Sequence, residues 1–247
     1  LDGLEDAYEG GLMGSFAQTT ADAFSLSRKA MDNFAIHSLS KANSAIADGV
    51  LESEIEAVEI TTRKGTVTVT TDEQPGQARI DKIPRLRAAF KKDGTITAAN
   101  ASSISDGASA LVLASEAAVA KNNLTPAAHI LGVQSFAGEP GDFTLAPISA
   151  VQSLLKSIDW QVKDVDLFEI NEAFAMVTML AIQELGLDNS KVNIYGGACA
   201  QGHPIGSTGS RIIVTLMTAL KNQGLKRGVA ALCIGGGEAT AVAIELV

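Results

Sequence analysis

Three short segments of the sequence carry side chains that could take part in catalysis. They are 171–174, 202–209 and 233–237, with the sequences NEAF, GHPIGSTG and CIGGG. Each follows the end of an expected strand, and open α/β sheets bind their ligands at the carboxyl ends of their strands. We therefore expect the three segments to lie close together and to form a single site.

Asn171 and His203 are the polar groups of the first two segments. The Asn171 amide could orient a water molecule or a substrate carbonyl, or it could simply cap the following helix, a position that Asn favours. His203 precedes an expected helix N-terminus, where positive potential favours a neutral imidazole with a basic nitrogen near neutral pH. A structural histidine is the alternative. A phosphate cradle is disfavoured because the loop lacks the Lys-Ser/Thr of a P-loop.

Cys233 ends an apolar segment and is closely followed by three glycines that begin at Gly235. Glycines expose backbone N–H groups suited to an oxyanion, here beside a thiol that could exchange a proton. The alternative is a buried cysteine before a tight turn. Taken together, His203 and Cys233 would form an acid/base pair, with Asn171 and Gly235 as oxyanion donors. We expect the second cysteine, Cys199, to be a small packing residue rather than a nucleophile.

The composition of the 247 residues excludes several classes of partner. A formal net charge of −9 argues against nucleic acid, and no apolar run is long enough to span a membrane. His37 and His129 have no acidic or cysteine neighbour at ligand spacing, so we expect no metal site. Two cysteines without zinc or thioredoxin spacing fit a reducing environment, and we expect a soluble, cytoplasmic protein.

Alternating helices and strands would position these segments. Apolar residues at helical spacing predict helices at 27–48, 147–158, 172–185 and 207–222. Strand-like patterns occur at 55–62, 66–71, 108–114, 130–134, 166–170, 192–195, 229–234 and 240–246. This alternation is typical of an α/β layered domain. The last two strands are separated by a linker too short for a crossover, so they must pair antiparallel and the sheet must be mixed.

In their order and spacing, the three segments resemble the thiolases. The resemblance continues upstream through Met13-Gly14, 63–65, 86–90 and 100–102, and so covers the whole chain. It implies the thiolase fold, a layered α/β/α/β/α arrangement with a complete C-terminal half-domain and a largely missing N-terminal one. The implied parts are a partial loop domain (1–104), the last strand and helix of the N-terminal half-domain (105–123) and the C-terminal half-domain (124–247).

The resemblance also assigns roles to the candidate residues. It implies that His203 activates a nucleophilic cysteine and that Cys233 exchanges a proton on the α-carbon of the second acyl-CoA. Asn171 would position a water in an oxyanion site formed with His203, and the Gly235 N–H would bind the thioester oxygen. Coenzyme A thioesters would be substrates, with no separate cofactor. The implied coenzyme A contacts are Leu4, Met13, Phe90, Ala98, Ser102 and Phe174.

The implied activity is the Claisen condensation of two acetyl-CoA to acetoacetyl-CoA, with the reverse thiolysis. Leu12 and Phe143 stand where short-chain members often carry His and Met, so a 3-ketoacyl-CoA thiolase of broader chain length is the first alternative. A ketoacyl synthase is disfavoured, because such enzymes place no cysteine at the position of Cys233. The alternative outside the enzymes is an inactive thiolase-fold fragment or scaffold.

No residue of the chain matches the motif of the thiolase nucleophile. The sequence starts at Leu1 without Met or leader, so we expect that an N-terminal segment with the nucleophile is missing and that the chain is inactive alone. The strand at 108–114 would then lack its neighbours and expose an apolar edge, which predicts poor solubility. For the intact protein the family implies a homodimer or homotetramer.

Overall fold

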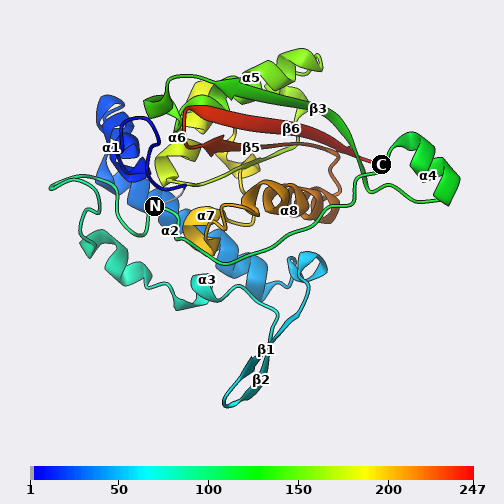
Figure 1. The fold of residues 1–247 in the computed structure, drawn as a ribbon, viewed down its shortest axis with the longest axis horizontal. Coiled ribbons are helices and arrows are strands. Elements are labelled where there is room, and N and C mark those ends of the chain that lie inside the picture. Colours follow the sequence, from blue (N-terminus) through cyan, green and yellow to red (C-terminus); the bar gives the residue numbers. More distant parts are fainter. Residues whose placement is uncertain (1–2) are drawn as a thin grey trace.

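A four-stranded mixed sheet forms the centre of the computed structural model, which describes residues 3–247 (Figure 1). Its strand order is β3 (Ala128–Ala137), β6 (Glu238–Leu246), β5 (Arg227–Ile234) and β4 (Leu167–Ile170). β4 and β5 run parallel, whereas β6 is antiparallel to both β5 and β3. The antiparallel pairing of the last two strands and the mixed sheet are confirmed.

Helices cover the sheet on both faces. α5 (Ala146–Ser157) packs on one face, where Leu154 and Ala243 belong to one buried cluster, and α8 (Thr208–Gln223) packs on the other, where Leu216 and Ile244 belong to another. Successive residues of a strand point to opposite faces, so Ala243 and Ile244 enter different cores. α6 (Ala175–Leu185) contacts α5 and the long helix α2 (Arg28–Ala47). The predicted helices at 27–48, 147–158 and 207–222 are confirmed within one residue at each end.

The first part of the chain wraps around this layer. α2 begins where predicted, because the Ser27 hydroxyl accepts a hydrogen bond from the Ala30 N–H at 3.1 Å. The remaining helices are α1 (Met13–Ala23), α3 (Glu73–Gln77), α4 (Glu116–Asn122) and α7 (Ala198–Gln201). Short 3₁₀ turns lie at Glu52–Glu54, Ile80–Arg85, Pro140–Asp142, Val162–Asp164 and Asn189–Lys191. None of the described helices is long and apolar enough to cross a membrane.

A β-hairpin projects from the body of the molecule. Its strands are β1 (Val58–Thr62) and β2 (Gly65–Val69), joined at 63–64, which confirms the predicted hairpin. All ten strand residues are exposed, and Figure 1 shows the hairpin extending away from the sheet and its helices. Its main-chain pairing is therefore local to the hairpin itself.

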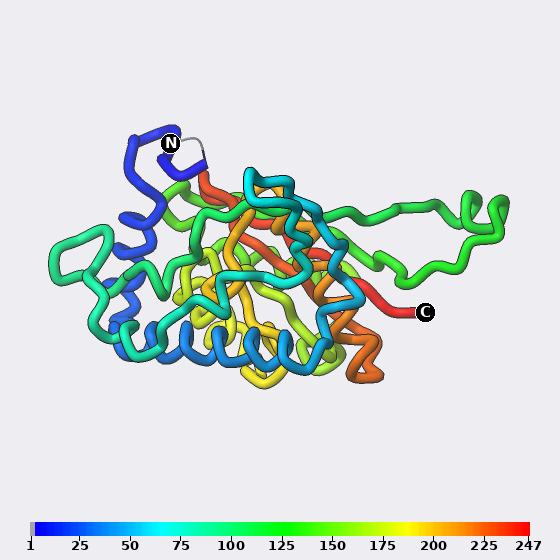
Figure 2. Tube along the Cα trace, turned by 90° about the horizontal axis from the view of Figure 1, so that it is seen from below, coloured from blue at the N-terminus to red at the C-terminus, as the bar shows by residue number. Residues whose placement is uncertain are grey.

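The predicted strand at 108–114 is wrong. This segment pairs with no strand and runs extended along the surface, and the chain from 105 to 127 reaches out of the body in Figure 2. Val112 is 94% exposed and Leu113 is 74% exposed. An apolar run forms a strand only where another strand offers its backbone groups, and no described residue does so here. The expected division of the chain at 104 and 123 stays a prediction.

The predicted strand at 192–195 is also wrong, and a side chain takes its place. Asn193 adopts a left-handed backbone conformation (φ 46°), which ends any extended pairing. Its side chain accepts a hydrogen bond from the Ile170 N–H and donates one to the Ile170 carbonyl, both at 2.8 Å. The amide group thus pairs with the end of β4 as a neighbouring strand would.

Ile244 and Ile130 are cross-strand partners that differ in burial, at 2% and 50% exposed. Replacing Ile244 with Ala should lower the free energy of unfolding by about 2–5 kcal/mol, because it leaves a cavity in a packed core. The matched Ile130→Ala change should cost less than about 1 kcal/mol. Urea unfolding followed by circular dichroism measures both values, and equal losses would contradict this difference in burial.

Candidate active site

Asn171 and His203 come together at the carboxyl end of β4. The Asn171 N–H donates to the Ala231 carbonyl at 2.9 Å, which keeps the chain extended beside β5 after β4 ends. Its side-chain Nδ2 lies 3.3 Å from Nε2 of His203. The predicted helix at 172–185 begins only at Ala175, with Phe174 as its N-cap. The alternative of Asn171 as a helix cap is therefore wrong.

A second hydrogen bond fixes which nitrogen of His203 carries the proton. Nδ1 lies 2.6 Å from the Thr208 hydroxyl, which itself donates to the Pro204 carbonyl at 3.0 Å. A hydroxyl has one proton, so Thr208 must accept from Nδ1–H. Nε2 is then the nitrogen with the free lone pair, and the Asn171 amide donates to it.

Burial keeps the imidazole of His203 neutral. Burial and, to a smaller extent, the Arg211 guanidinium together lower the pKa of His203 to about 4. The neutral ring agrees with the sequence-based expectation. Its causes, however, are burial and a neighbouring cation, whereas the expectation rested on the helix N-terminus.

Cys233 lies at the end of β5 with its thiol buried. Burial raises the pKa of Cys233 to about 12, so it carries its proton at neutral pH. The side chain belongs to the apolar cluster that includes Met13 and Phe174. Gly235 follows in the turn, and a Cβ at this position would come within 2.9 Å of Met13 Sδ. A side chain at position 235 would therefore displace the Met13 side chain from the turn.

Aromatic side chains surround this cluster. Phe90 meets Phe174 edge-on, with ring centroids 6.2 Å apart. The ring of Phe143 is tilted relative to that of Phe174, and the two centroids are 6.5 Å apart. Such arrangements favour close packing of aromatic groups. Met13, Phe90 and Phe174, which the resemblance links to coenzyme A, thus converge on the apolar surroundings of Cys233.

The other three expected coenzyme A contacts lie at different places. The Met13 N–H donates to the Leu4 carbonyl at 2.9 Å, so Leu4 adjoins the cluster. Both the backbone N–H and the hydroxyl of Ser102 donate to the Ala173 carbonyl at 3.0 Å, next to Phe174. Ala98 is exposed in the turn that precedes these residues.

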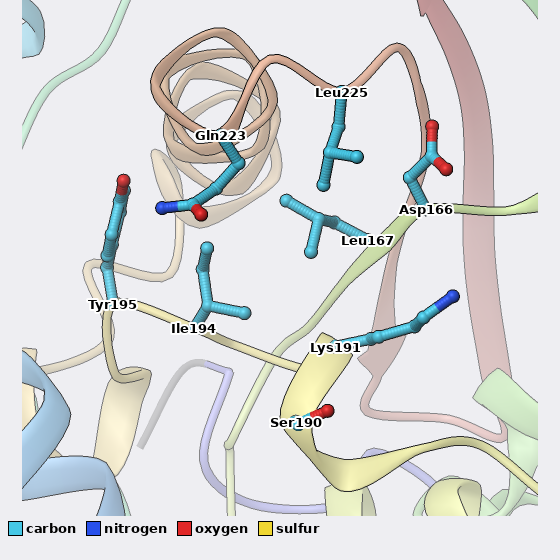
Figure 3. A pocket seen from close by; sticks show the side chains of 8 residues that line it. All are labelled: Asp166, Leu167, Ser190, Lys191, Ile194, Tyr195, Gln223 and Leu225. Carbon is cyan, nitrogen blue, oxygen red and sulfur yellow. The ribbon is translucent and has the colours of Figure 1, made fainter.

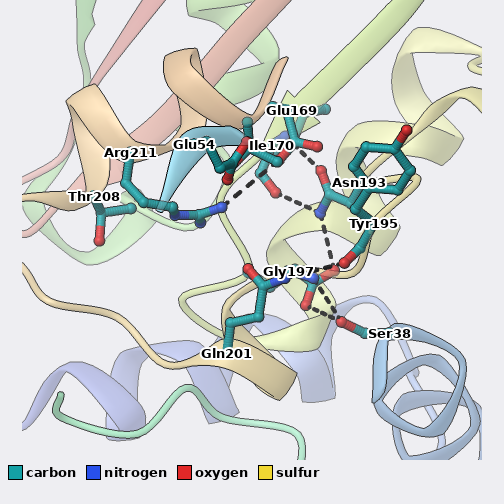
Figure 4. A network of polar contacts seen from close by, with 12 residues as sticks. Ser38, Glu54, Glu169, Ile170, Asn193, Tyr195, Gly197, Gln201, Thr208 and Arg211 are labelled. Atoms are coloured by element: carbon teal, nitrogen blue, oxygen red, sulfur yellow. Dashed lines mark hydrogen bonds and ion pairs between the residues drawn. The ribbon is translucent and has the colours of Figure 1, made fainter. Parts of the chain in front are cut away.

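Glu172, which the sequence reasoning missed, is a hub of buried hydrogen bonds. Its carboxylate accepts hydrogen bonds from the Ser38 hydroxyl at 2.7 Å, the Asn193 amide at 2.9 Å and the Cys199 N–H at 3.1 Å. Figure 4 labels the donors Ser38 and Asn193. A Cβ on Gly197 would lie 2.3 Å from the Glu172 carboxyl carbon. Burial nevertheless raises the pKa of Glu172. The group joins α2, the 193 loop and the turn that leads to His203.

Cys199 is part of the support of this hub. It is buried, and its thiol contacts the Glu172 carbonyl at 3.7 Å. Burial, together with the charge of Glu172, raises the pKa of Cys199 well above its ordinary value. Such a thiol is a poor source of thiolate, which agrees with the expected packing role.

Glu169 and Arg211 form a second buried pair that the sequence reasoning missed. Glu169 is 2% exposed on β4, and its Oε2 lies 4.0 Å from Arg211 Nη1 on α8 (Figure 4). Burial raises the pKa of Glu169 to about 8, more than Arg211 lowers it. A signal was available in the sequence, because Glu169 interrupts an otherwise apolar strand and a buried charge needs a partner.

A cavity of about 420 Å³ lies elsewhere, at the start of β4 (Figure 3). Leu167 and Tyr195 line it together with the end of α8. Asn171 lies at the opposite end of the same strand. The cavity is therefore separate from the Asn171–His203 site.

Comparison with known proteins identifies the family. The model of the thiolase N-terminal domain matches residues 1–117, and that of the thiolase C-terminal domain matches residues 124–246. The chain therefore belongs to the thiolase family. It is 45% identical to a probable acetyl-CoA acetyltransferase of Dictyostelium discoideum, over 99% of this chain and 59% of that protein. It is 46% identical to an acetyl-CoA acetyltransferase of Schizosaccharomyces pombe, over 100% of this chain and 63% of that protein.

Solved structures show the same fold. The acetyl-CoA acetyltransferase of Bacillus anthracis superposes with a TM-score of 0.95 at 38% identity, over 99% of this chain and 62% of that one. A thiolase from Ascaris suum in complex with coenzyme A superposes with a TM-score of 0.92 at 43% identity, over 100% of this chain and 63% of that one. Human mitochondrial 3-ketoacyl-CoA thiolase superposes with a TM-score of 0.91 at 37% identity, over 99% of this chain and 62% of that one. The expected thiolase fold is thus confirmed.

The chain spans about three fifths of the length of the curated relatives it matches. The expectation of a missing N-terminal segment is not borne out, because the model of the N-terminal domain matches from residue 1 onward. A largely missing half-domain is likewise unconfirmed.

Replacing Thr208 with Val removes the acceptor of the Nδ1 proton and keeps the shape of the side chain. We expect the Nε2-protonated form of His203 to appear, because Nδ1–H then lacks its partner. Nitrogen NMR of the histidine ring measures the two forms. Thr208→Ser keeps a hydroxyl and should preserve the original form. A fully Nδ1-protonated ring in the Val variant would show that Thr208 does not set the tautomer.

Replacing Glu169 with Gln should flatten part of the pH dependence of stability. Glu169 has a pKa of about 8 in the folded chain against 4.5 as its ordinary value, so the folded state binds the proton more tightly. That stabilisation is complete below about pH 4.5 and is lost as the pH rises towards about 8. The wild type should therefore lose stability relative to Glu169→Gln across this window in urea unfolding. The exposed Glu184→Gln serves as control and should follow the wild type.

Proposed function

We propose that the chain supplies the His203, Asn171 and Cys233 part of a thiolase active site, that of an acetyl-CoA acetyltransferase, which converts two acetyl-CoA to acetoacetyl-CoA and coenzyme A and catalyses the reverse thiolysis. The observation that carries the proposal is the 3.3 Å contact between Asn171 and a neutral His203, beside the strand that ends at the buried thiol of Cys233. The names of the 45–46% identical relatives and the coenzyme A complex of the Ascaris suum thiolase support it.

In this proposal His203 and Asn171 serve the acyl transfer. Neutral His203 offers the Nε2 lone pair to the proton of an attacking thiol. Asn171 Oδ1 is buried and, within residues 3–247, has no hydrogen-bond partner, which suits the binding of a water molecule. That water and the Gly235 N–H would stabilise the oxyanions of the two thioester steps.

Cys233 would serve the step at the α-carbon. In thiolysis an attacking thiol forms a bond to the β-carbonyl carbon; the bond between the α- and β-carbons then breaks, its electron pair passes to the α-carbon, and the acyl group stays on the attacking sulfur. The Cys233 thiol donates its proton to this carbanion and then recovers a proton from the coenzyme A thiol. A thiol that remains protonated near pH 7 suits this step, because the carbanion is a much stronger base than a thiolate.

We propose that neither cysteine of the chain accepts the acyl group. A nucleophilic thiol needs a lowered pKa and an accessible sulfur. Cys199 and Cys233 are both buried, and burial raises the pKa of each. We therefore expect the chain by itself to catalyse proton exchange on acetyl-CoA without thiolysis.

A 3-ketoacyl-CoA thiolase of broader chain length is the second candidate. Phe143 is 2% exposed and packs on Phe174, so a flexible methionine is replaced by a rigid ring beside the apolar cluster. The likeness to human mitochondrial 3-ketoacyl-CoA thiolase supports this candidate. Relative rates on acyl-CoA substrates of increasing chain length distinguish the two.

Exchange of the α-protons of acetyl-CoA with deuterated water tests the proposal directly, because this step needs no acyl-enzyme. NMR follows the loss of the methyl proton signal. Cys233→Ala should lower the exchange rate by about 100-fold or more, since a positioned acid or base contributes about 10²–10⁴-fold. Cys199→Ala is the matched control, also a buried thiol, and should leave the rate within about threefold.

Thiolysis of acetoacetyl-CoA by the same samples completes the experiment. Exchange that depends on Cys233, without thiolysis, is the expected result. Thiolysis that disappears in Cys199→Ala would contradict the packing role of this residue and make it the acyl acceptor. Absence of exchange in the folded wild type would contradict the proposed role of Cys233.

A further inference from the structure

The cavity at the start of β4 has the make-up of a small-molecule site. It measures about 420 Å³ and lies at the opposite end of the strand from Asn171. Its middle is apolar, and Figure 3 shows Leu167, Ile194 and Leu225 between a charged side, with Asp166 and Lys191, and a neutral polar side, with Tyr195 and Gln223. Apolar walls with a few polar groups at fixed places are typical of ligand pockets.

The charged side offers a free positive group. A parallel bridge between Phe168 and Val192 sets the 3₁₀ turn at Asn189–Lys191 alongside the start of β4, so Lys191 and Asp166 line the same side of the cavity. No salt bridge joins the two side chains, and the Lys191 ammonium forms no ion pair with any residue from 3 to 247. Its charge is therefore available to a ligand.

Asp166 keeps one carboxylate oxygen for a ligand. Its Oδ2 accepts hydrogen bonds from the backbone N–H groups of Lys226 and Arg227, at 3.0 and 2.9 Å. These bonds hold the carboxylate in place, and its Oδ1 has no hydrogen-bond partner in the part of the chain that the structure describes. A molecule with both an ammonium and a carboxylate would pair with Asp166 and Lys191 together, through charge-assisted hydrogen bonds.

The neutral side contains a buried hydroxyl without a partner. Tyr195 is 7% exposed, and its hydroxyl makes no hydrogen bond within residues 3–247. Leaving a buried polar group unpaired is costly, so a ligand that brings a small polar group to this side is favoured. The amide of Gln223 lies on the same side in Figure 3 and adds a second polar group there.

We propose that this cavity binds an α-amino acid whose side chain is apolar along its length and ends in a small polar group. The ammonium pairs with Asp166 Oδ1 and the carboxylate pairs with Lys191. The side chain covers Leu167 and Leu225, and its polar tip meets the hydroxyl of Tyr195. Each group of the ligand thus answers one group of the cavity, and the site does not depend on the proposed acyl transfer.

Four small molecules test the proposal on the unmodified full chain. Tyrosine carries all three groups, whereas tyramine lacks the carboxylate, hydroxyphenylpropanoate lacks the ammonium and phenylalanine lacks the hydroxyl. Titrations followed by nitrogen–proton correlation NMR measure each dissociation constant and locate the ligand through the amide signals of 190–195. Tyrosine should bind about tenfold more tightly than each analogue, because each analogue leaves one polar group of the cavity unpaired.

Two lysine variants separate a direct contact from general attraction. Lys191→Met should weaken tyrosine binding by about tenfold and leave tyramine binding within about twofold, because tyramine has no carboxylate. Lys221 is exposed near the end of α8 and does not line the cavity. Lys221→Met should leave both dissociation constants within about twofold, since solvent screens an exposed charge.

A third variant tests the neutral side. Tyr195→Phe removes the buried hydroxyl and keeps the ring. It should weaken the binding of tyrosine and leave that of phenylalanine unchanged, because only tyrosine carries the tip that meets the hydroxyl. Equal losses for the two amino acids would show that Tyr195 contributes by packing alone and would contradict its proposed contact.

Three results would overturn the proposal as a whole. Equal affinities for tyrosine and its analogues would mean that the cavity selects only an apolar ring. Shifts confined to 171–174 and 202–209 would place the ligand at the proposed active site. Unchanged signals at 190–195 in the folded chain would mean that water alone fills the cavity. Because the readout is the binding of a free amino acid, these results stand apart from the exchange assay on acetyl-CoA.

Discussion

The buried carboxylate of Glu172 is the interaction on which the arrangement of the site depends. Three donors converge on it, namely Ser38 of α2, Asn193 and the Cys199 N–H of α7. The Asn193 amide also donates to the Ile170 carbonyl, but loss of the carboxylate would leave the buried Ser38 hydroxyl and Cys199 N–H without this acceptor. Hydrophobic packing brings the layers together, but this one group fixes how the His203 loop meets the end of β4.

Burial keeps the titratable groups of the site mainly uncharged. It lowers the pKa of His203 and raises those of Cys233 and Glu169, so all three groups are mainly uncharged near pH 7. Neutral His203 can accept a proton and protonated Cys233 can donate one, and these are the two roles that the proposed reaction requires. Arg211 is the exception, and its charge acts on neighbours whose own charges are suppressed.

The sequence predicted those elements whose patterns are local. Helix caps and spacing located α2, α5 and α8, and the short linker between β5 and β6 dictated their antiparallel pairing. The two failures differ in cause: the segment 108–114 has no neighbouring strand among the described residues, whereas at 192–195 the left-handed Asn193 ends the pairing with β4 after a single bridge at Val192. For the site, the strand-end segments pointed to Asn171 and His203. The hydrogen bond between Ser38 and Glu172 joins residues 134 positions apart, so no local sequence pattern predicts it.

The exposed hairpin of β1 and β2 gives the molecule an attachment point. Its ladder is complete within ten residues and its turn at 63–64 lies at the far tip, away from the cores (Figure 1). Exposed loop tips tolerate insertions because little packing depends on them. A fluorophore or an affinity tag inserted at this turn would therefore report on the chain, or immobilise it, while leaving the sheet and the His203 loop unaltered.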